Sequence, residues 1–134
     1  MGRSQGENIV MKHVILPLIA LALIIGIGAF ESIAIHSIYK DFEEKVDNLI
    51  QLCLQEDLTQ KQYETFCQDW VCTRKKSELF LPHNDVYEIT LRVSEIKAYV
   101  IQQDYQLCLA HLLVIKDLAS YVGQIVTPSL GHIL

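Results

Sequence analysis

The sequence predicts an all-α protein in which one N-terminal transmembrane helix precedes a small antiparallel bundle of about four helices, arranged as two hairpins. Three observations predict this fold. An uncharged apolar stretch lies near the N-terminus, apolar residues beyond it recur at spacings of three and four, and no glycine or proline interrupts residues 31–57. With 134 residues, the chain has room for one domain of ordinary size beyond the apolar stretch.

The apolar stretch runs from Val14 to Phe30 and is bracketed by Lys12 and Glu31. Its 17 residues would span roughly 25 Å as a helix, at the short end of what crosses the hydrocarbon core of a bilayer. Apolar residues beyond Glu31 extend it. We therefore expect a transmembrane anchor over residues 13–34, after a short cytoplasmic segment at 1–12, which makes the lipid bilayer the first partner of the chain.

Basic residues set the expected orientation of this anchor. Arg3 and Lys12 precede it, which keeps the N-terminus in the cytoplasm and places residues 35–134 outside. The expected location is a cell membrane crossed once. A cleaved signal peptide is the alternative, because Ser32-Ile33-Ala34 and Gly26-Ile27-Gly28 have small residues at the spacing that signal peptidase reads, and the rest would then be secreted. Met11 is an alternative start to Met1.

The part beyond the anchor is acidic. Arg3, Lys12 and Glu7 give the first thirty residues a net charge of +1. The whole chain has a net charge of −5, so the remaining residues carry a net charge of −6. Such a surface repels phosphate backbones and gains little from anionic lipid headgroups. Nucleic acid is therefore excluded as an expected partner, and docking on anionic lipid is disfavoured.

Four helices and a tail are expected beyond the anchor, with the bundle over residues 35–126 and the tail over 127–134. The first helix continues directly out of the membrane to Glu56. The second runs from Gln60 to about Phe80, begins at a Thr59–Gln62 capping box, and is ended by Pro82. The third begins at Asn84 or Asp85, and the fourth runs from Tyr105 to about Val122 and should be the most buried. The predicted core positions of the first three helices are Ile35, Ile38, Phe42, Leu49, Leu52 and Cys53; Tyr63, Phe66, Cys67, Trp70, Val71, Arg74 and Ser77 or Glu78; and Val86, Ile89, Val93, Ile96 and Val100. The fourth helix is apolar on nearly every side, with Leu107, Leu109, Leu112, Leu113, Val114, Ile115 and Leu118 spread around it.

An internal resemblance supports two hairpins. Leu54-Gln55-Glu56-Asp57 is similar to Ile101-Gln102-Gln103-Asp104, and each is followed by a tyrosine near the start of an apolar helix. Such repetition is typical of paired helical units, although amphipathic helices also resemble one another by chance.

Candidate reactive residues are few. The sequence has no phosphate-binding glycine loop, no nucleophile elbow and no His-Glu-x-x-His, so we expect no enzyme and assign no cofactor. A disulfide between Cys53 and Cys67 is one alternative for an extracytoplasmic chain, and free thiols in a helical core are the other. A metal site would need Cys67, Cys72, His83 and His111, whose spacing lacks the tight knuckle of structural zinc sites.

With these segments noted, the chain from Met11 to Leu134 resembles a bacterial domain-of-unknown-function family numbered 4363. The resemblance rests on Gly28-Ala29-Phe30-Glu31, Trp70 followed by basic residues, Leu79-Phe80-Leu81-Pro82-His83, and the final Ser129-Leu130-Gly131-His132-Ile133-Leu134. Asn84 and His132 depart from the family pattern, and the four cysteines are not a mark of it. The resemblance implies an anchored helical protein of a bacterial cell membrane and supplies no activity.

The candidate interaction or structural residues are Trp70, Arg74, His83 and Asp85. The leading hypothesis is a noncatalytic interaction module that binds or regulates another membrane or envelope protein, with self-association as a further option. The alternative is a bundle that senses a small ligand or metal between helices, near Trp70, His83 and His111.

Overall fold

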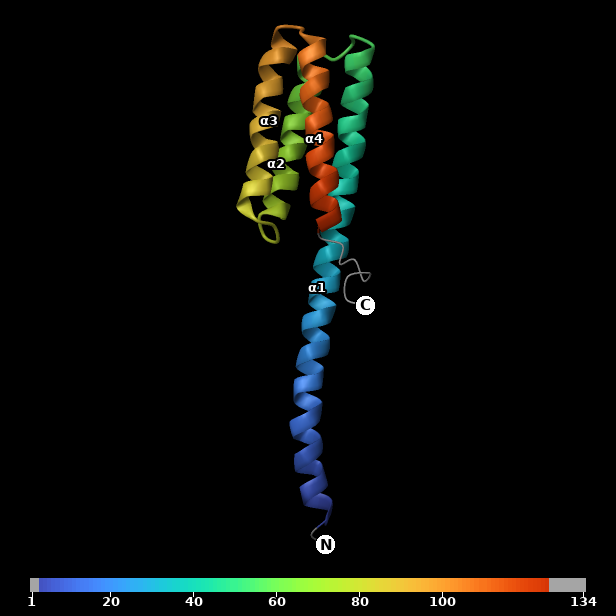
Figure 1. The fold of residues 1–134 in the computed structure, drawn as a ribbon, viewed down its shortest axis with the longest axis vertical. Coiled ribbons are helices and arrows are strands. Elements are labelled where there is room, and N and C mark those ends of the chain that lie inside the picture. Colours follow the sequence, from blue (N-terminus) through green and yellow to red (C-terminus); the bar gives the residue numbers. More distant parts are fainter. Residues whose placement is uncertain (1–2, 126–134) are drawn as a thin grey trace.

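The computed structural model describes residues 3–125, which form four α-helices. These are α1 (Arg3–Leu54), α2 (Gln60–Ser77), α3 (His83–Ile101) and α4 (Tyr105–Ile125). The described part of the chain contains no strand, so the all-α prediction is confirmed. Figure 1 shows the four helices bundled at one end of a single long helix.

The long helix is α1, which continues without a break for 52 residues. Its N-terminal part extends alone, and its C-terminal part joins the bundle (Figure 1). Because no glycine or proline lies between residues 31 and 57, nothing interrupts its backbone hydrogen bonds at the junction, as expected from the sequence. Pro17 lies inside the helix, within the apolar stretch.

Two of the described helices, α1 and α4, are long and apolar enough to cross a membrane by length and composition alone. They differ in burial. The apolar window of α1 has no buried residue, whereas a third of the window of α4 is buried in the protein. The apolar character of α4 is therefore explained in part by its place in the bundle.

Each helix of the bundle contacts two neighbours. α1 packs against α2 and α4, and α3 packs against α2 and α4, while the diagonal pairs do not touch within residues 3–125. Consecutive helices are antiparallel, which gives the expected two hairpins. We call the end where α1 leaves the bundle the anchor end; it holds the α2–α3 turn (78–82) and Ile125. The opposite end, with the turns at 55–59 and 102–104, is the cap end.

The core is formed by apolar side chains from all four helices and one turn. Its buried members are Ile35, Tyr39, Phe42, Val46, Leu49, Ile50 and Cys53; Leu58; Tyr63, Phe66 and Trp70; Val86, Ile89, Val93, Ile96 and Val100; and Cys108, Leu112, Ile115, Ala119 and Val122. The five positions of α3 are those predicted. On α1 the prediction missed Tyr39, Val46 and Ile50, and Ile38 and Leu52 are only partly buried.

The two turns of the cap end have the same backbone geometry. Glu56 and Gln103 adopt left-handed φ values of 55° and 56°. The following amides of Asp57 and Asp104 donate to carbonyls five residues earlier, at 2.8 and 3.0 Å. This is the Schellman arrangement that closes a helix C-terminus. The internal resemblance noted in the sequence thus corresponds to a repeated helix-ending turn.

Helix starts at the two ends of the bundle differ. Thr59 and Gln62 form the predicted capping box at the cap end, with both hydrogen bonds present. At the anchor end α3 begins at His83, earlier than the predicted Asn84 or Asp85, and its N-cap residue Pro82 makes no side-chain hydrogen bond. α2 ends at Ser77 and not near Phe80, because the amides of Phe80 and Leu81 both turn back to the Ser77 carbonyl.

The prediction that α4 is the most buried helix is confirmed among the helices that lie wholly within the bundle: six of its 21 residues are buried, against four of 18 in α2 and five of 19 in α3. Its burial is nevertheless one-sided. Leu107, Leu113 and Val114 are 41%, 47% and 40% exposed, since α4 contacts α1 and α3 on one side only. The helix also continues to Ile125 and not to about Val122. The predicted tail over 127–134 lies outside the described residues.

Candidate functional site

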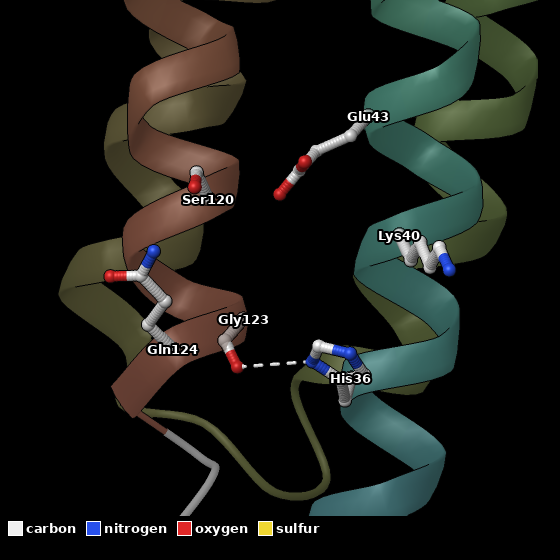
Figure 2. Close-up of a pocket in the computed structure, with 6 residues that line it drawn as sticks. All are labelled: His36, Lys40, Glu43, Ser120, Gly123 and Gln124. Atoms are coloured by element: carbon white, nitrogen blue, oxygen red, sulfur yellow. Dashed lines mark hydrogen bonds between the residues drawn. The ribbon is translucent and has the colours of Figure 1, made fainter.

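A polar groove lies between α1 and α4 at the anchor end of the bundle. His36, Lys40 and Glu43 line it from α1, and Ser120, Gly123 and Gln124 line it from α4. The groove encloses about 250 Å³. Figure 2 shows the Glu43 carboxylate reaching into the gap between the helices, while Lys40 points to the far side of α1.

A hydrogen-bond contact between His36 and Gly123 crosses this groove. His36 Nδ1 lies 3.5 Å from the carbonyl oxygen of Gly123, at the long limit of a hydrogen bond, and donates only in the tautomer that carries its proton on Nδ1 (Figure 2). A Cβ at Gly123 would lie 3.7 Å from the Cβ of Tyr39, which is an ordinary van der Waals contact, so the packing of α4 on α1 leaves room for a methyl group at this position.

The groups in the groove suit binding better than bond cleavage. A nucleophile needs a base within hydrogen-bonding distance, and Ser120 has no such bond to His36 or Glu43 in the structure. The imidazole, carboxylate and hydroxyl together offer donors and acceptors to a small polar ligand. His36, Lys40 and Glu43 follow one another at spacings of four and three, so their common face was visible in the sequence.

Trp70 lies inside the bundle and is 2% exposed. Its ring centroid is 4.9 Å from that of Phe42, and its Nε1 donates to Thr90 Oγ1 at 3.2 Å. Thr90 in turn donates to the Val86 carbonyl at 2.9 Å. Trp70 therefore joins α1, α2 and α3 as a core residue, and no face of it is free for a partner.

Tyr39 places a phenol beside the anchor-end turn. Its hydroxyl is buried without a well-formed hydrogen bond. The Ser77 hydroxyl is near, and Ser77 Oγ donates to the Thr73 carbonyl at 2.7 Å. Burial raises the pKa of Tyr39, and the nearby Asp85 carboxylate raises it further. This phenol remains neutral at physiological pH.

Arg74, His83 and Asp85 gather near the anchor end without forming one site. Arg74 Nε lies 3.5 Å from Glu78 on its own helix. His83 is exposed and stacks on Tyr87 with ring centroids 6.0 Å apart. Asp85 lies in the first turn of α3, where its charge favours the helix dipole.

His111 belongs to a different part of the bundle. Its ring lies 5.1 Å from Tyr99, and Nδ1 is 3.3 Å from a Glu95 carboxylate oxygen, nearer the cap end. The structure therefore does not bring Trp70, His83 and His111 together. Within residues 3–125, no three or more His, Cys, Asp or Glu side chains are grouped to hold a metal.

The four cysteines are free thiols, two of them at the cap end of the core. The thiols of Cys53 and Cys108 interact with each other, across the contact between α1 and α4. Cys67 interacts instead with the Tyr63 hydroxyl, and Cys72 is exposed. The pairing of Cys53 with Cys67 stays a prediction, and the geometry offers Cys108 as a second partner for Cys53.

Comparison with known proteins then places the chain. A family model described as a domain of unknown function, DUF4363, matches residues 29–133. The chain belongs to the DUF4363 family. The resemblance seen in the sequence is thereby confirmed, and the match covers the four-helix bundle while omitting most of the apolar stretch of α1. No curated protein and no solved structure gave a significant match.

For this DUF4363 chain, sequence reasoning missed the groove. Neither His36 nor Gly123 is among the candidate residues that the sequence indicates. Their contact joins positions 87 residues apart, so it depends on how α1 and α4 align. The spacing of His36, Lys40 and Glu43 on one helix face was the only signal in the sequence.

Proposed function

We propose that this chain is a single-pass membrane protein whose extracytoplasmic bundle is a noncatalytic interaction module for another membrane or envelope protein. The observation that carries the proposal is an apolar surface on the outside of α4. The anchor limits the partners that this surface meets to proteins held at the same membrane.

The exposed apolar stretch of α1 supports the anchor. Between Val14 and Phe30 every large hydrophobic side chain is 46–71% exposed, and no charged residue interrupts the stretch. A helix that is apolar on all sides and packs against nothing is unfavourable in water, and a bilayer core satisfies it. Lys12 before the stretch favours a cytoplasmic N-terminus.

The surface on α4 comprises Leu107, Leu113, Val114, Tyr121 and Ile125, which are 40–60% exposed. Most of them follow the three-four spacing of one helix face, and Asp117 is the charged residue among them. Contiguous exposed apolar residues of this kind mark interaction sites on soluble domains. A partner helix laid along α4 would cover them without disturbing the core.

Photocrosslinking in cells tests the proposal. A photoreactive phenylalanine analogue at Tyr121 is expected to capture one membrane protein, and Val114→Asp should abolish that product. The same analogue at Gln68, exposed on α2, is the matched control. Equal products at both positions, capture of a second copy of the chain alone, or no product at Tyr121 would overturn the proposal.

Cys72 tests the orientation, because it is the one exposed native thiol among the four cysteines. A membrane-impermeant maleimide should label it on intact cells, and Cys72→Ser should remove the signal. Labelling that requires lysis would place the bundle in the cytoplasm.

The groove of Figure 2 favours a second candidate function, the sensing of a small polar ligand. A thermal-shift screen of the full chain in detergent, with simple anions, cations and amino acids, tests it. Sensing predicts a rise in Tm for one compound class that His36→Ala and Glu43→Gln both remove, whereas His111→Ala keeps it. If no compound class raised the Tm, the sensing function would be rejected.

A further inference from the structure

The turn between α2 and α3 presents two apolar side chains at the anchor end. Leu79 is 78% exposed, the highest value among the large hydrophobic residues whose side chains the structure describes, and Phe80 is 42% exposed. The turn itself is held firmly, because the amides of Phe80 and Leu81 donate to the Ser77 carbonyl at 3.0 and 2.9 Å. The turn therefore holds the exposed Leu79 side chain in a defined place at the anchor end.

Phe80 lies at the level where the apolar stretch of α1 ends. It lines one hollow together with Ala22, Gly26 and Phe30, and a second together with Gly28 and Ser32. In Figure 1 the turn lies beside α1 just where that helix leaves the bundle. If α1 spans a bilayer, Phe30 and Glu31 mark the boundary between hydrocarbon and headgroups, so Phe80 lies at the depth where aromatic residues gather in membrane proteins.

Charge at the same place complements a lipid surface. Lys75 and Lys76, in the last turn of α2, are exposed, and the structure gives neither an ion pair within residues 3–125. The neighbouring Arg74 is neutralised by Glu78. The chain is acidic as a whole, and that acidity made docking on anionic lipid a poor expectation. At the anchor end, however, two ammonium groups without an ion pair lie next to an apolar turn. Contact with anionic lipid is therefore favourable at this end, although the chain as a whole is acidic.

We propose that the anchor end is a second membrane contact, in which Leu79 and Phe80 enter the bilayer interface and Lys75 and Lys76 bind lipid phosphates. The proposal rests on the proposed membrane anchoring of α1. Together the two contacts fix how the bundle stands on the membrane, because one helix alone leaves the bundle free to rotate about the helix axis. The outer face of α4 is then held at a fixed orientation to the membrane plane.

Fluorescence quenching by lipids with brominated acyl chains tests the apolar contact. The full chain is placed in nanodiscs of such lipids, and Leu79→Trp is compared with Ile101→Trp, which is 57% exposed at the cap end. Leu21→Trp reports on the anchor, and Trp70, common to all samples, is subtracted with the wild-type signal. We expect Leu79→Trp to be quenched at least half as strongly as Leu21→Trp, and Ile101→Trp to be quenched hardly at all.

The outcomes separate this proposal from the proposed anchoring. Quenching at Leu21→Trp without quenching at Leu79→Trp overturns the second contact and keeps the anchor. No quenching at either position overturns both. Helical circular dichroism and Tm equal to those of the wild type confirm that each tryptophan variant is folded.

A charge variant tests the lysine contact. Adding phosphatidylglycerol to phosphatidylcholine nanodiscs should deepen the quenching of Leu79→Trp, and the added K75Q/K76Q change should remove that increase. The matched control K61Q/K97Q alters two exposed lysines elsewhere on α2 and α3 and should keep it. Equal behaviour of the two double variants would overturn the lysine contact.

Discussion

The two ends of the bundle are built in different ways. At the cap end, two helices close with the same left-handed turn, α2 begins at a complete capping box, and two thiols face each other in the core. At the anchor end, α3 begins without a side-chain cap, a polar groove opens, and Leu79 projects outward. The helix ends at the cap end are closed by side-chain caps and left-handed turns, whereas α3 at the anchor end begins without a side-chain cap.

The largest expected effect is a difference in stability between substitution of a buried and of an exposed apolar residue near the anchor end. Trp70→Ala should lower the free energy of unfolding by about 3–5 kcal/mol, because it removes a buried ring packed on Phe42. Leu79→Ala should change it by less than about 0.5 kcal/mol, since Leu79 is 78% exposed. Denaturant titration followed by circular dichroism in detergent micelles measures both. If the two variants lowered the free energy of unfolding by similar amounts, Leu79 would contribute to the stability of the fold, which would contradict its assignment to contacts outside the bundle.

The cap end should show a dependence on alkaline pH. Burial, with the nearby Cys108 thiol, raises the pKa of Cys53 from 9.0 to about 12. The unfolded thiol ionises first, so the stability that this group confers is intact below pH 9 and is lost as the pH rises toward 12. The loss should be on the order of 1 kcal/mol per pH unit within that window.

Two variants test this assignment by denaturation at several pH values. Cys53→Ala should flatten the decline above pH 9, while Cys72→Ala, at an exposed position, should leave the slope unchanged. The buried tyrosine Tyr63, whose pKa is also raised by burial, would contribute to any decline that remains. An unchanged slope in Cys53→Ala would contradict the role given to this thiol.

The smallest expected effect comes from the turns of the cap end. Glu56→Gly and Gln103→Gly should each raise the free energy of unfolding by about 0.5–1 kcal/mol, because glycine adopts a positive φ without the clash of a side chain. Gln102→Gly is the control, since Gln102 has φ −79° and gains no such relief. If both Glu56→Gly and Gln103→Gly lowered the free energy of unfolding, the two native side chains would make contacts worth more than the cost of their positive φ.

The helices were predictable from local signals. The five core positions of α3 follow an unbroken three-four spacing, and Thr59 with Gln62 is a recognisable capping pair, so both needed no knowledge of other helices. Boundaries at the anchor end were harder, because Asn84 and Asp85 resemble caps while the Ser77 carbonyl had already ended α2 with two backbone bonds.

The candidate sites depended on contacts between distant helices. Hydrophobicity indicates that a residue of α4 is apolar, but not which side meets α1 and α3, so Leu113 and Val114 were expected in the core. Likewise, nothing near His36 in the sequence points to Gly123. Trp70 was rightly singled out, yet only its neighbours Phe42 and Thr90 show that it is a core residue.

Because α1 is unbroken, a small bend near its N-terminal end displaces its C-terminal end by a large distance. From Pro17, where the helix lacks one backbone hydrogen bond, to Leu54 is roughly 55 Å at 1.5 Å per residue. A bend of about 10° at Pro17 would move the cap end sideways by roughly 10 Å. If the apolar stretch spans a bilayer as proposed, a small rearrangement within it is amplified at the far end of the bundle. A leucine seated in the bilayer interface, well off the axis of α1, would oppose that movement.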